Sequence, residues 1–129
     1  MTVYSGGCHC AAVRFEADLD DTSAALECNC SVCEMCGFQH LIAPKNRFRL
    51  ITGQDSLTEY RFNSGQAQHF FCKVCGIKPF YIPRSNPDGV SVNLRCLDDP
   101  KPDFGIEPFD GQNWEQNAAS LRHLSKTED

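Results

Sequence analysis

Eight of the nine cysteines in this 129-residue chain lie in short clusters whose spacing suits metal binding. The clusters are Cys8-His-Cys10, Cys28-Asn-Cys30-Ser-Val-Cys33-Glu-Met-Cys36 and Cys72-Lys-Val-Cys75. Cysteines two or three positions apart form poor disulfides with each other, but their sulfurs converge readily on one tetrahedral ion. The spacing therefore predicts zinc, and the number of cysteines predicts more than one zinc ion.

The pair Cys72 and Cys75, followed by Gly76, has the form of a zinc knuckle. Such a turn directs backbone N–H groups at the sulfurs, and the glycine supplies the positive φ that closes it. Cys8 and Cys10 share one face of a regular strand and can supply two further ligands. Four thiolates leave no position for water or substrate, so this set predicts a structural site.

The middle cluster allows two interpretations. Cys28, Cys30 and Cys33 supply three ligands, and a fourth, open position is typical of a catalytic zinc. Such a zinc can polarise a carbonyl, lower the pKa of a water or hold an external thiol as thiolate. Alternatively, Cys36, which precedes Gly37 as in another knuckle, closes the shell and makes this site structural as well.

A different pairing of the cysteines also remains open. Cys8 and Cys10 could join Cys33 and Cys36, while Cys28 and Cys30 join Cys72 and Cys75. Both sites would then be structural. The spacing alone does not decide between these pairings.

The overall charge argues against nucleic-acid binding by this domain. The net charge is −5, from 12 Lys+Arg and 17 Asp+Glu, and no long basic run is present. Phosphate binding needs a basic face, which thiolate zinc sites would make still less basic. The sequence also has no apolar stretch of membrane-spanning length and no basic-then-apolar start at residues 1–7. We therefore expect a cytoplasmic protein, where metal binding explains the cysteines better than disulfides do.

Short strands separated by turn residues must position these clusters. Alternation of apolar and polar residues and the turn signals predict a mostly β chain with one C-terminal helix. The expected strands cover residues 3–5, 12–18, 24–28, 38–43, 47–52, 57–62, 68–71, 80–83 and 90–94, and the helix covers residues 113–124. Trp114, Ala118 and Leu121 lie on one face of that helix. No linker divides the chain, so we expect a single domain over residues 1–129.

Several isolated residues are candidates for other roles. Arg84 and Arg95 suit a substrate carboxylate, because a guanidinium fork matches that group. His40 and His69 lie in expected strands, where most histidines are structural. Cys96 stands alone and is expected to be a small buried residue.

The three cysteine motifs and their flanking residues resemble the glutathione-dependent formaldehyde-activating enzyme family. The matching motifs are Gly6-Gly-Cys-His-Cys-Ala-Ala-Val-Arg-Phe-Glu16, Cys28-Asn-Cys-Ser-Val-Cys33 and Phe71-Cys-Lys-Val-Cys-Gly76, followed by Pro79-Phe-Tyr81. Residues 69–97 look especially like the centromere protein V branch. The resemblance covers about residues 4–116, nearly the whole chain.

This resemblance implies a β-tent fold of stacked antiparallel sheets, stabilised by zinc, with two zinc ions per chain. By the resemblance, the structural zinc is bound by Cys8, Cys10, Cys72 and Cys75. The catalytic zinc is bound by Cys28, Cys30 and Cys33, with water or a substrate thiol as the fourth ligand. Residues 34–36, which are Glu-Met-Cys, depart from the basic residues often found there and keep Cys36 as an alternative fourth ligand.

The implied activity is that of a carbon–sulfur lyase of the S-hydroxymethylglutathione synthase type. Its partners would be a small thiol such as glutathione and a small aldehyde, formaldehyde in the founding members. The competing hypothesis is a non-catalytic, zinc-stabilised scaffold or binding module like the centromere-associated relatives. The sequence leaves the true substrate and the oligomeric state open.

Overall fold

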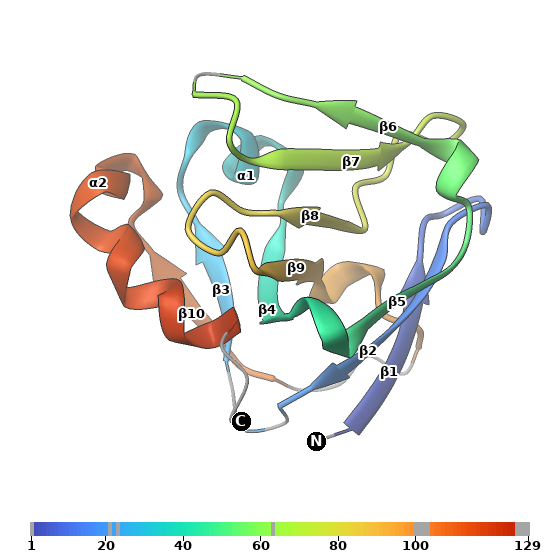
Figure 1. The fold of residues 1–129 in the computed structure, drawn as a ribbon, viewed down its shortest axis with the longest axis horizontal. Coiled ribbons are helices and arrows are strands. Elements are labelled where there is room, and N and C mark those ends of the chain that lie inside the picture. The colour runs from blue at the N-terminus through green and yellow to red at the C-terminus, as the bar shows by residue number, and fades with distance from the viewer. Residues whose placement is uncertain (1, 21, 23, 63, 100–103, 126–129) are drawn as a thin grey trace.

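The computed structural model describes residues 2–20, 22, 24–62, 64–99 and 104–125. Within these residues ten strands form a three-stranded sheet, in the order β1-β2-β5, and a seven-stranded sheet, in the order β10-β3-β4-β9-β8-β7-β6 (Figure 1). The strands are β1 (Thr2–Gly7), β2 (Arg14–Leu19), β3 (Ala25–Cys28), β4 (Gln39–Pro44), β5 (Phe48–Thr52), β6 (Leu57–Tyr60), β7 (Gln68–Cys72), β8 (Phe80–Ile82), β9 (Gly89–Asn93) and β10 (Ile106–Phe109).

Helices are short throughout the described residues. Two are α-helical, α1 (Ser31–Cys36) and α2 (Trp114–Asn117). The 3₁₀ helices cover Lys45–Arg47, Gln54–Ser56, Leu94–Cys96, Gly111–Asn113 and Ala118–Ser125. None of the helices in the described part of the chain is long and apolar enough to cross a membrane.

The core lies between the two sheets because alternate residues of the seven-stranded sheet face the three-stranded one. Strand pairing places Phe70, Phe80 and Val92 side by side on β7, β8 and β9. The ring of Phe80 packs on Phe48 of β5 at 4.6 Å and on Phe15 of β2 at 6.3 Å between centroids. Burying these aromatic rings contributes much of the hydrophobic stabilisation of a domain of this size. The other face of the same strands therefore lies outside this core.

The mostly β prediction is confirmed, and each of the nine expected strands overlaps an observed one. The tenth strand, β10, was not expected, because Ile106–Phe109 is short and contains Pro108. Proline lacks the N–H of a central strand and is tolerated at a sheet edge, where β10 lies. β10 pairs with β3 in parallel, so the expectation of purely antiparallel sheets is wrong for this pair.

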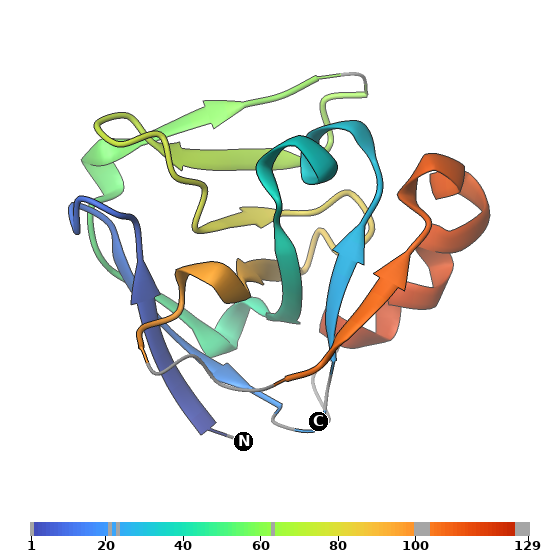
Figure 2. The same cartoon turned by 180° about the vertical axis from the view of Figure 1, so that it is seen from behind.

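The expected C-terminal helix is also corrected. Residues 114–117 are α-helical, but residues 118–125 continue as a 3₁₀ helix. The Asn86 side-chain amide donates to the carbonyl of Leu121 at 2.8 Å and to the hydroxyl of Ser125 at 2.9 Å. These tertiary hydrogen bonds tie the segment to the loop between β8 and β9. Figures 1 and 2 show it lying outside β3 and β10, on the side away from the three-stranded sheet.

Candidate metal centres and the adjoining cavity

One candidate metal centre contains four sulfurs from the two ends of the strand-rich region. The sulfurs of Cys8, Cys10, Cys72 and Cys75 all lie within 4.8 Å of one another. The Cys10 sulfur is 3.6 Å from both the Cys8 and the Cys72 sulfur. A disulfide would need about 2.05 Å between sulfurs. Sulfurs bound to a tetrahedral zinc at roughly 2.3 Å lie about 3.8 Å apart, so this donor set fits zinc.

Two tight turns bring these four sulfurs together. Cys8 follows β1 and Cys72 ends β7, so the cluster joins the two sheets. At the first turn, the Val13 N–H donates to the Cys8 sulfur at 3.3 Å; at the second, the Val74 N–H donates to the Cys72 sulfur at 3.4 Å. Gly76 has a φ of 78° and donates its N–H to the Cys72 carbonyl at 2.8 Å. Backbone N–H groups aimed at the Cys72 sulfur lower the pKa of this thiol and so favour the thiolate form that a metal needs.

The second candidate centre contains three sulfurs around the start of α1. Cys28 ends β3, Cys30 precedes the first turn of α1 and Cys33 lies within it, and their sulfurs lie within 4.8 Å of one another. The Cys30 N–H points at the Cys28 sulfur at 3.5 Å. The Cys30 carbonyl accepts the Glu34 N–H at 2.9 Å, so the helix itself holds the third cysteine toward the first two. Three thiolates fit zinc with one coordination position left for another ligand.

Cys36 is not part of this three-sulfur group. It is exposed at the end of α1, and its sulfur contacts the Cys33 carbonyl at 3.8 Å. Its sulfur does not lie within 4.8 Å of all three others. Gly37, with a φ of 67°, ends the helix at this point and turns the chain into β4. The alternative pairing of Cys33 and Cys36 with Cys8 and Cys10 is therefore not the arrangement in the fold.

Hydrogen bonds among the three thiols shift their pKa values in opposite directions. Bonds with Cys28 and Cys30, together with burial, raise the pKa of the Cys33 thiol far above its ordinary value. Bonds with Cys28 and Cys33 lower the pKa of Cys30 well below it. The lowered pKa of Cys30 favours its thiolate, which is the form that binds a cation or acts as a nucleophile.

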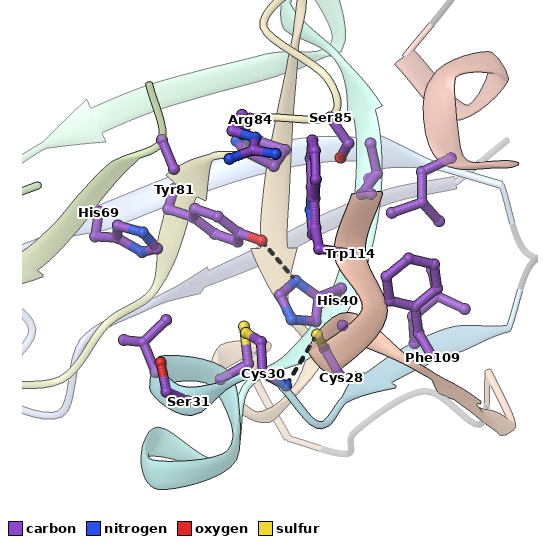
Figure 3. Close-up of a pocket in the computed structure, with 18 of the residues that line it drawn as sticks. Cys28, Cys30, Ser31, His40, His69, Tyr81, Arg84, Ser85, Phe109 and Trp114 are labelled. Atoms are coloured by element: carbon purple, nitrogen blue, oxygen red, sulfur yellow. Dashed lines mark hydrogen bonds between the residues drawn. The ribbon is translucent and has the colours of Figure 1, made fainter. Parts of the chain in front are cut away.

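A cavity of about 340 Å³ adjoins the three-sulfur centre (Figure 3). Its walls contain the three cysteines, apolar and aromatic side chains, and few polar groups; they include Leu26, Cys28, Cys30, Cys33, His40, Ile42, Phe62, His69, Tyr81, Arg84, Phe109, Trp114 and Leu121. None of the four cysteines of the first centre lines it. A largely apolar cavity with a few convergent polar groups is typical of a small-molecule site.

Strand register explains why the polar side chains of the cavity gather in one place. Ser91 of β9 is paired with Tyr81 of β8, and Tyr81 is paired with His69 of β7. On the other side, Ser91 is paired with Ile42 of β4. His40 precedes Ile42 by two residues and so shares its face. These residues occupy the face opposite the apolar core row described above.

His40 and His69 are buried and held as neutral imidazoles. The His40 Nδ1 lies 3.0 Å from the Ser91 hydroxyl and 3.3 Å from the Tyr81 hydroxyl, and the His69 Nδ1 lies 2.7 Å from the Lys78 amine. Burial, aided by the nearby Lys78 charge, lowers the pKa of His40 to about 3 and that of His69 to about 4. Burial raises the pKa of Tyr81 well above its ordinary value, so its hydroxyl keeps its proton.

The other sequence candidates have different surroundings. Arg84 lines the cavity, but its guanidinium stacks on the Trp114 ring at 3.4 Å. Arg95 is exposed. The Cys96 sulfur is half-buried and points at the carbonyl of Lys78 at 3.7 Å.

Three neighbours of the site were not expected from the sequence. Lys78 packs its amine over the Tyr81 ring at 4.1 Å, and burial lowers its pKa. Ser91 reaches His40 across the sheet, and Gly111 lies so close to Cys28 that a side chain there would meet its sulfur. No local pattern indicates such contacts, because each depends on pairing between distant segments.

Comparison with known proteins places the chain in a broader context. Residues 3–112 match the family model described as glutathione-dependent formaldehyde-activating enzyme. The fold is also similar to the crystal structure of a Rhodobacter sphaeroides protein, a structural genomics target, with 37% sequence identity and a TM-score of 0.74. That match covers 81% of this chain and 97% of the other.

Proposed function

Because the chain belongs to the glutathione-dependent formaldehyde-activating enzyme family, we propose that it is a zinc-dependent carbon–sulfur lyase-type enzyme. The reaction joins glutathione, or another thiol, to formaldehyde and gives an S-hydroxymethyl thioether, S-hydroxymethylglutathione when the thiol is glutathione. The supporting observation is that the three-sulfur centre borders a cavity, whereas no cysteine of the four-sulfur centre lines it.

In this proposal the two centres have separate roles. Cys8, Cys10, Cys72 and Cys75 hold a structural zinc, and Cys28, Cys30 and Cys33 hold a catalytic zinc. When bound at the second centre, zinc supplies Lewis acidity, which keeps a thiol ionised at neutral pH. The sulfurs of Cys28 and Cys30 line the cavity beside His40, so the substrate sulfur would lie next to them (Figure 3).

The cavity walls orient the substrate and exclude water. Leu26, Ile42, Phe109 and Trp114 surround the approach to the sulfurs with apolar surface. Excluding water strengthens electrostatic interactions at the reacting atoms. Holding the thiol and the aldehyde in one small volume also removes much of the entropic cost of their encounter.

The alternative function is a non-catalytic zinc-stabilised scaffold. A second centre closed by Cys36 would favour it, because a closed shell leaves no position for substrate. The exposed position of Cys36, outside the three-sulfur group, supports the enzyme instead. We further propose that the chain is a single β-tent domain, with its core at about residues 4–116, and that it acts in the cytoplasm. This domain is not expected to bind nucleic acid.

Exchange spectroscopy tests the proposed reaction. Zinc-loaded protein is added to formaldehyde with glutathione, and in parallel with small aliphatic thiols, and the exchange rate between free and adduct signals is measured. We expect the wild-type protein to raise the exchange rate above the uncatalysed rate with at least one thiol. The Cys30→Ser variant should leave the exchange rate at the uncatalysed value. A rate equal to the uncatalysed one with every thiol would contradict the enzyme and favour the scaffold.

A further inference from the structure

Two buried nitrogen atoms in the cavity have no hydrogen-bond partner among the described residues: the Nε2 atoms of His40 and His69. A buried polar atom without a partner is costly, and native proteins rarely keep one without a functional reason. Both rings line the cavity beside the three-sulfur centre. These atoms therefore indicate a ligand with polar atoms of matching type.

We propose that the Nε2–H of His40 is a hydrogen-bond donor for the oxygen of a carbonyl compound or of its thiol adduct, bound beside the three-sulfur centre. The chemical class of the ligand is thus an aldehyde, or a hydroxyalkyl thioether, whose oxygen enters the inner end of the cavity. This inference rests on the proposed function, which supplies the reaction in which this oxygen takes part.

The partners of the other ring nitrogen determine which hydrogen-bonding type His40 presents. Its Nδ1 faces two hydroxyls, Ser91 at 3.0 Å and Tyr81 at 3.3 Å. Because Tyr81 retains its proton, we assign its hydroxyl as the donor and Nδ1 of His40 as the acceptor. In a neutral imidazole the proton must then be on Nε2, which becomes a donor.

The ring also points the right way for this role. Figure 3 shows the imidazole of His40 between the Tyr81 hydroxyl and the sulfurs of Cys28 and Cys30. The ring is only 5% exposed and packs against Phe38 at 4.5 Å between centroids, so its orientation is held by packing as well. Donors fixed in advance stabilise developing negative charge without reorganisation during the reaction.

His69 shows the same arrangement farther along the sheet. Lys78 donates to its Nδ1 at 2.7 Å, and its ring stacks on Tyr81 at 4.9 Å with an angle of 7°. Its Nε2 is therefore also a donor. The Tyr81 ring contacts both histidines, because it also lies 5.5 Å from the His40 ring between centroids.

The step that the donor serves is a balanced addition. The thiolate sulfur forms a bond to the carbonyl carbon, and the π pair of the C=O bond moves to the oxygen. Negative charge develops on that oxygen, where the Nε2–H of His40 donates. The oxygen then takes a proton from water, equal to the one lost when the thiol ionised, so that nothing is oxidised or reduced.

Variants at His40 test the donor by rate. We expect His40→Leu to lower the catalysed rate about 100-fold, as for loss of an oxyanion donor, while zinc content stays at the wild-type value. His40→Gln, whose amide can donate from a similar position, should recover the rate to within about tenfold of wild type. His123→Leu, the same substitution at an exposed histidine, is the matched control. A wild-type rate in His40→Leu would overturn the proposal, and loss of zinc from that variant would instead make His40 a ligand.

Two measurements test the same site independently of turnover. Nitrogen-15 spectra of the histidine side chains should show His40 with its proton on Nε2, and the combined Tyr81→Phe and Ser91→Ala changes should remove this preference. Zinc-loaded protein is also titrated with two thiols of similar size, 2-mercaptoethanol and 1-propanethiol. The first has a hydroxyl where the second has a methyl group. His40→Leu should reduce the preference for the hydroxyl thiol about fivefold, as expected for one hydrogen bond.

These measurements separate failure of this proposal from failure of the proposed function. If no thiol gives catalysis but the tautomer and the hydroxyl preference are as expected, the oxygen site remains and the proposed reaction is wrong. If catalysis occurs but the proton lies on Nδ1, or the preference is unchanged in His40→Leu, the oxygen site is wrong. If His40→Leu fails to fold, the double variant Tyr81→Phe/Ser91→Ala takes its place, because it removes both hydroxyls at the His40 Nδ1 and keeps the imidazole; a wild-type rate in that variant would also overturn the proposal.

Discussion

The two cysteine centres use the same ligand atom but differ in their position in the fold. The four-sulfur centre joins β1 of one sheet to β7 of the other, and its Cys8 and Cys72 are buried. The three-sulfur centre lies on the far face of the seven-stranded sheet and adjoins the cavity. The comparison shows that chain topology, more than the type of cysteine motif, separates a centre that joins the two sheets from a centre that adjoins a cavity.

Their consequences for stability should differ for the same reason. The contact between Cys10 and Cys72 closes a loop of 62 positions and links the two sheets. A metal bound there stabilises the folded state by its binding free energy, since the unfolded chain has no formed site. The three-sulfur centre draws all its cysteines from residues 28–33, so a metal there restrains only a local turn.

The largest expected effect is that of Cys72→Ser. Removing a ligand of the proposed structural zinc should abolish cooperative unfolding, because a structural zinc contributes about 10 kcal/mol or more, comparable to the whole stability of a domain. Thermal unfolding followed by circular dichroism and zinc analysis measure the effect. Cys96→Ser is the matched control, because Cys96 is outside both centres. Cooperative unfolding of Cys72→Ser near the wild-type temperature would contradict the structural role.

Cys30→Ser should have a large effect on activity and a small one on folding. The variant should lose the second zinc and the catalysed exchange, while its midpoint of thermal unfolding stays within a few degrees of wild type. Zinc analysis, exchange spectroscopy and thermal unfolding on the same sample test this. If Cys30→Ser unfolds as readily as Cys72→Ser, the distinction between the two centres is wrong.

Metal removal should proceed in two stages. Elemental analysis should give close to two zinc ions per chain, and a graded chelator should remove the zinc of the three-sulfur centre first, because it has one protein ligand fewer and adjoins the cavity. Loss of the first equivalent should abolish exchange without unfolding the chain. A stoichiometry near one, or simultaneous loss of both ions, would contradict two separate sites.

The smallest effect is expected for Cys36→Ser. This cysteine is exposed and outside the three-sulfur group, so its replacement should change the unfolding free energy by about 0.5 kcal/mol or less. Zinc content and the exchange rate should equal those of wild type. Loss of one zinc ion from this variant would show that Cys36 closes the second centre, and would favour the scaffold over the enzyme.

Much of the fold could be predicted from local patterns. Alternation over residues 47–52 and 57–62 identified β5 and β6, since side chains of a strand point alternately to opposite faces. β10 could not be predicted, because four residues with a proline become a strand only by pairing with β3. The 3₁₀ form of residues 118–125 likewise depends on Asn86, which lies more than 30 positions away.

In the candidate site, too, some features follow from local sequence and others depend on contacts between distant segments. Short spacing indicated which cysteines could share a metal ion, because neighbours in a turn or strand bring their sulfurs close together. The partners of the His40 Nδ1 were beyond any local pattern, since Ser91 and Tyr81 reach it from two other strands. The contact of Lys78 with His69 was likewise not indicated by any local pattern.

By itself the sequence determined a mostly β chain with three cysteine motifs suited to zinc, because alternation and ligand spacing are properties of neighbouring residues. Only the tertiary structure decided that four sulfurs meet between the sheets and three beside a cavity, with Cys36 outside both groups. The spacing left these pairings open. Strand pairing across the sheets resolved them, because it sets the distance between residues that are far apart in the chain.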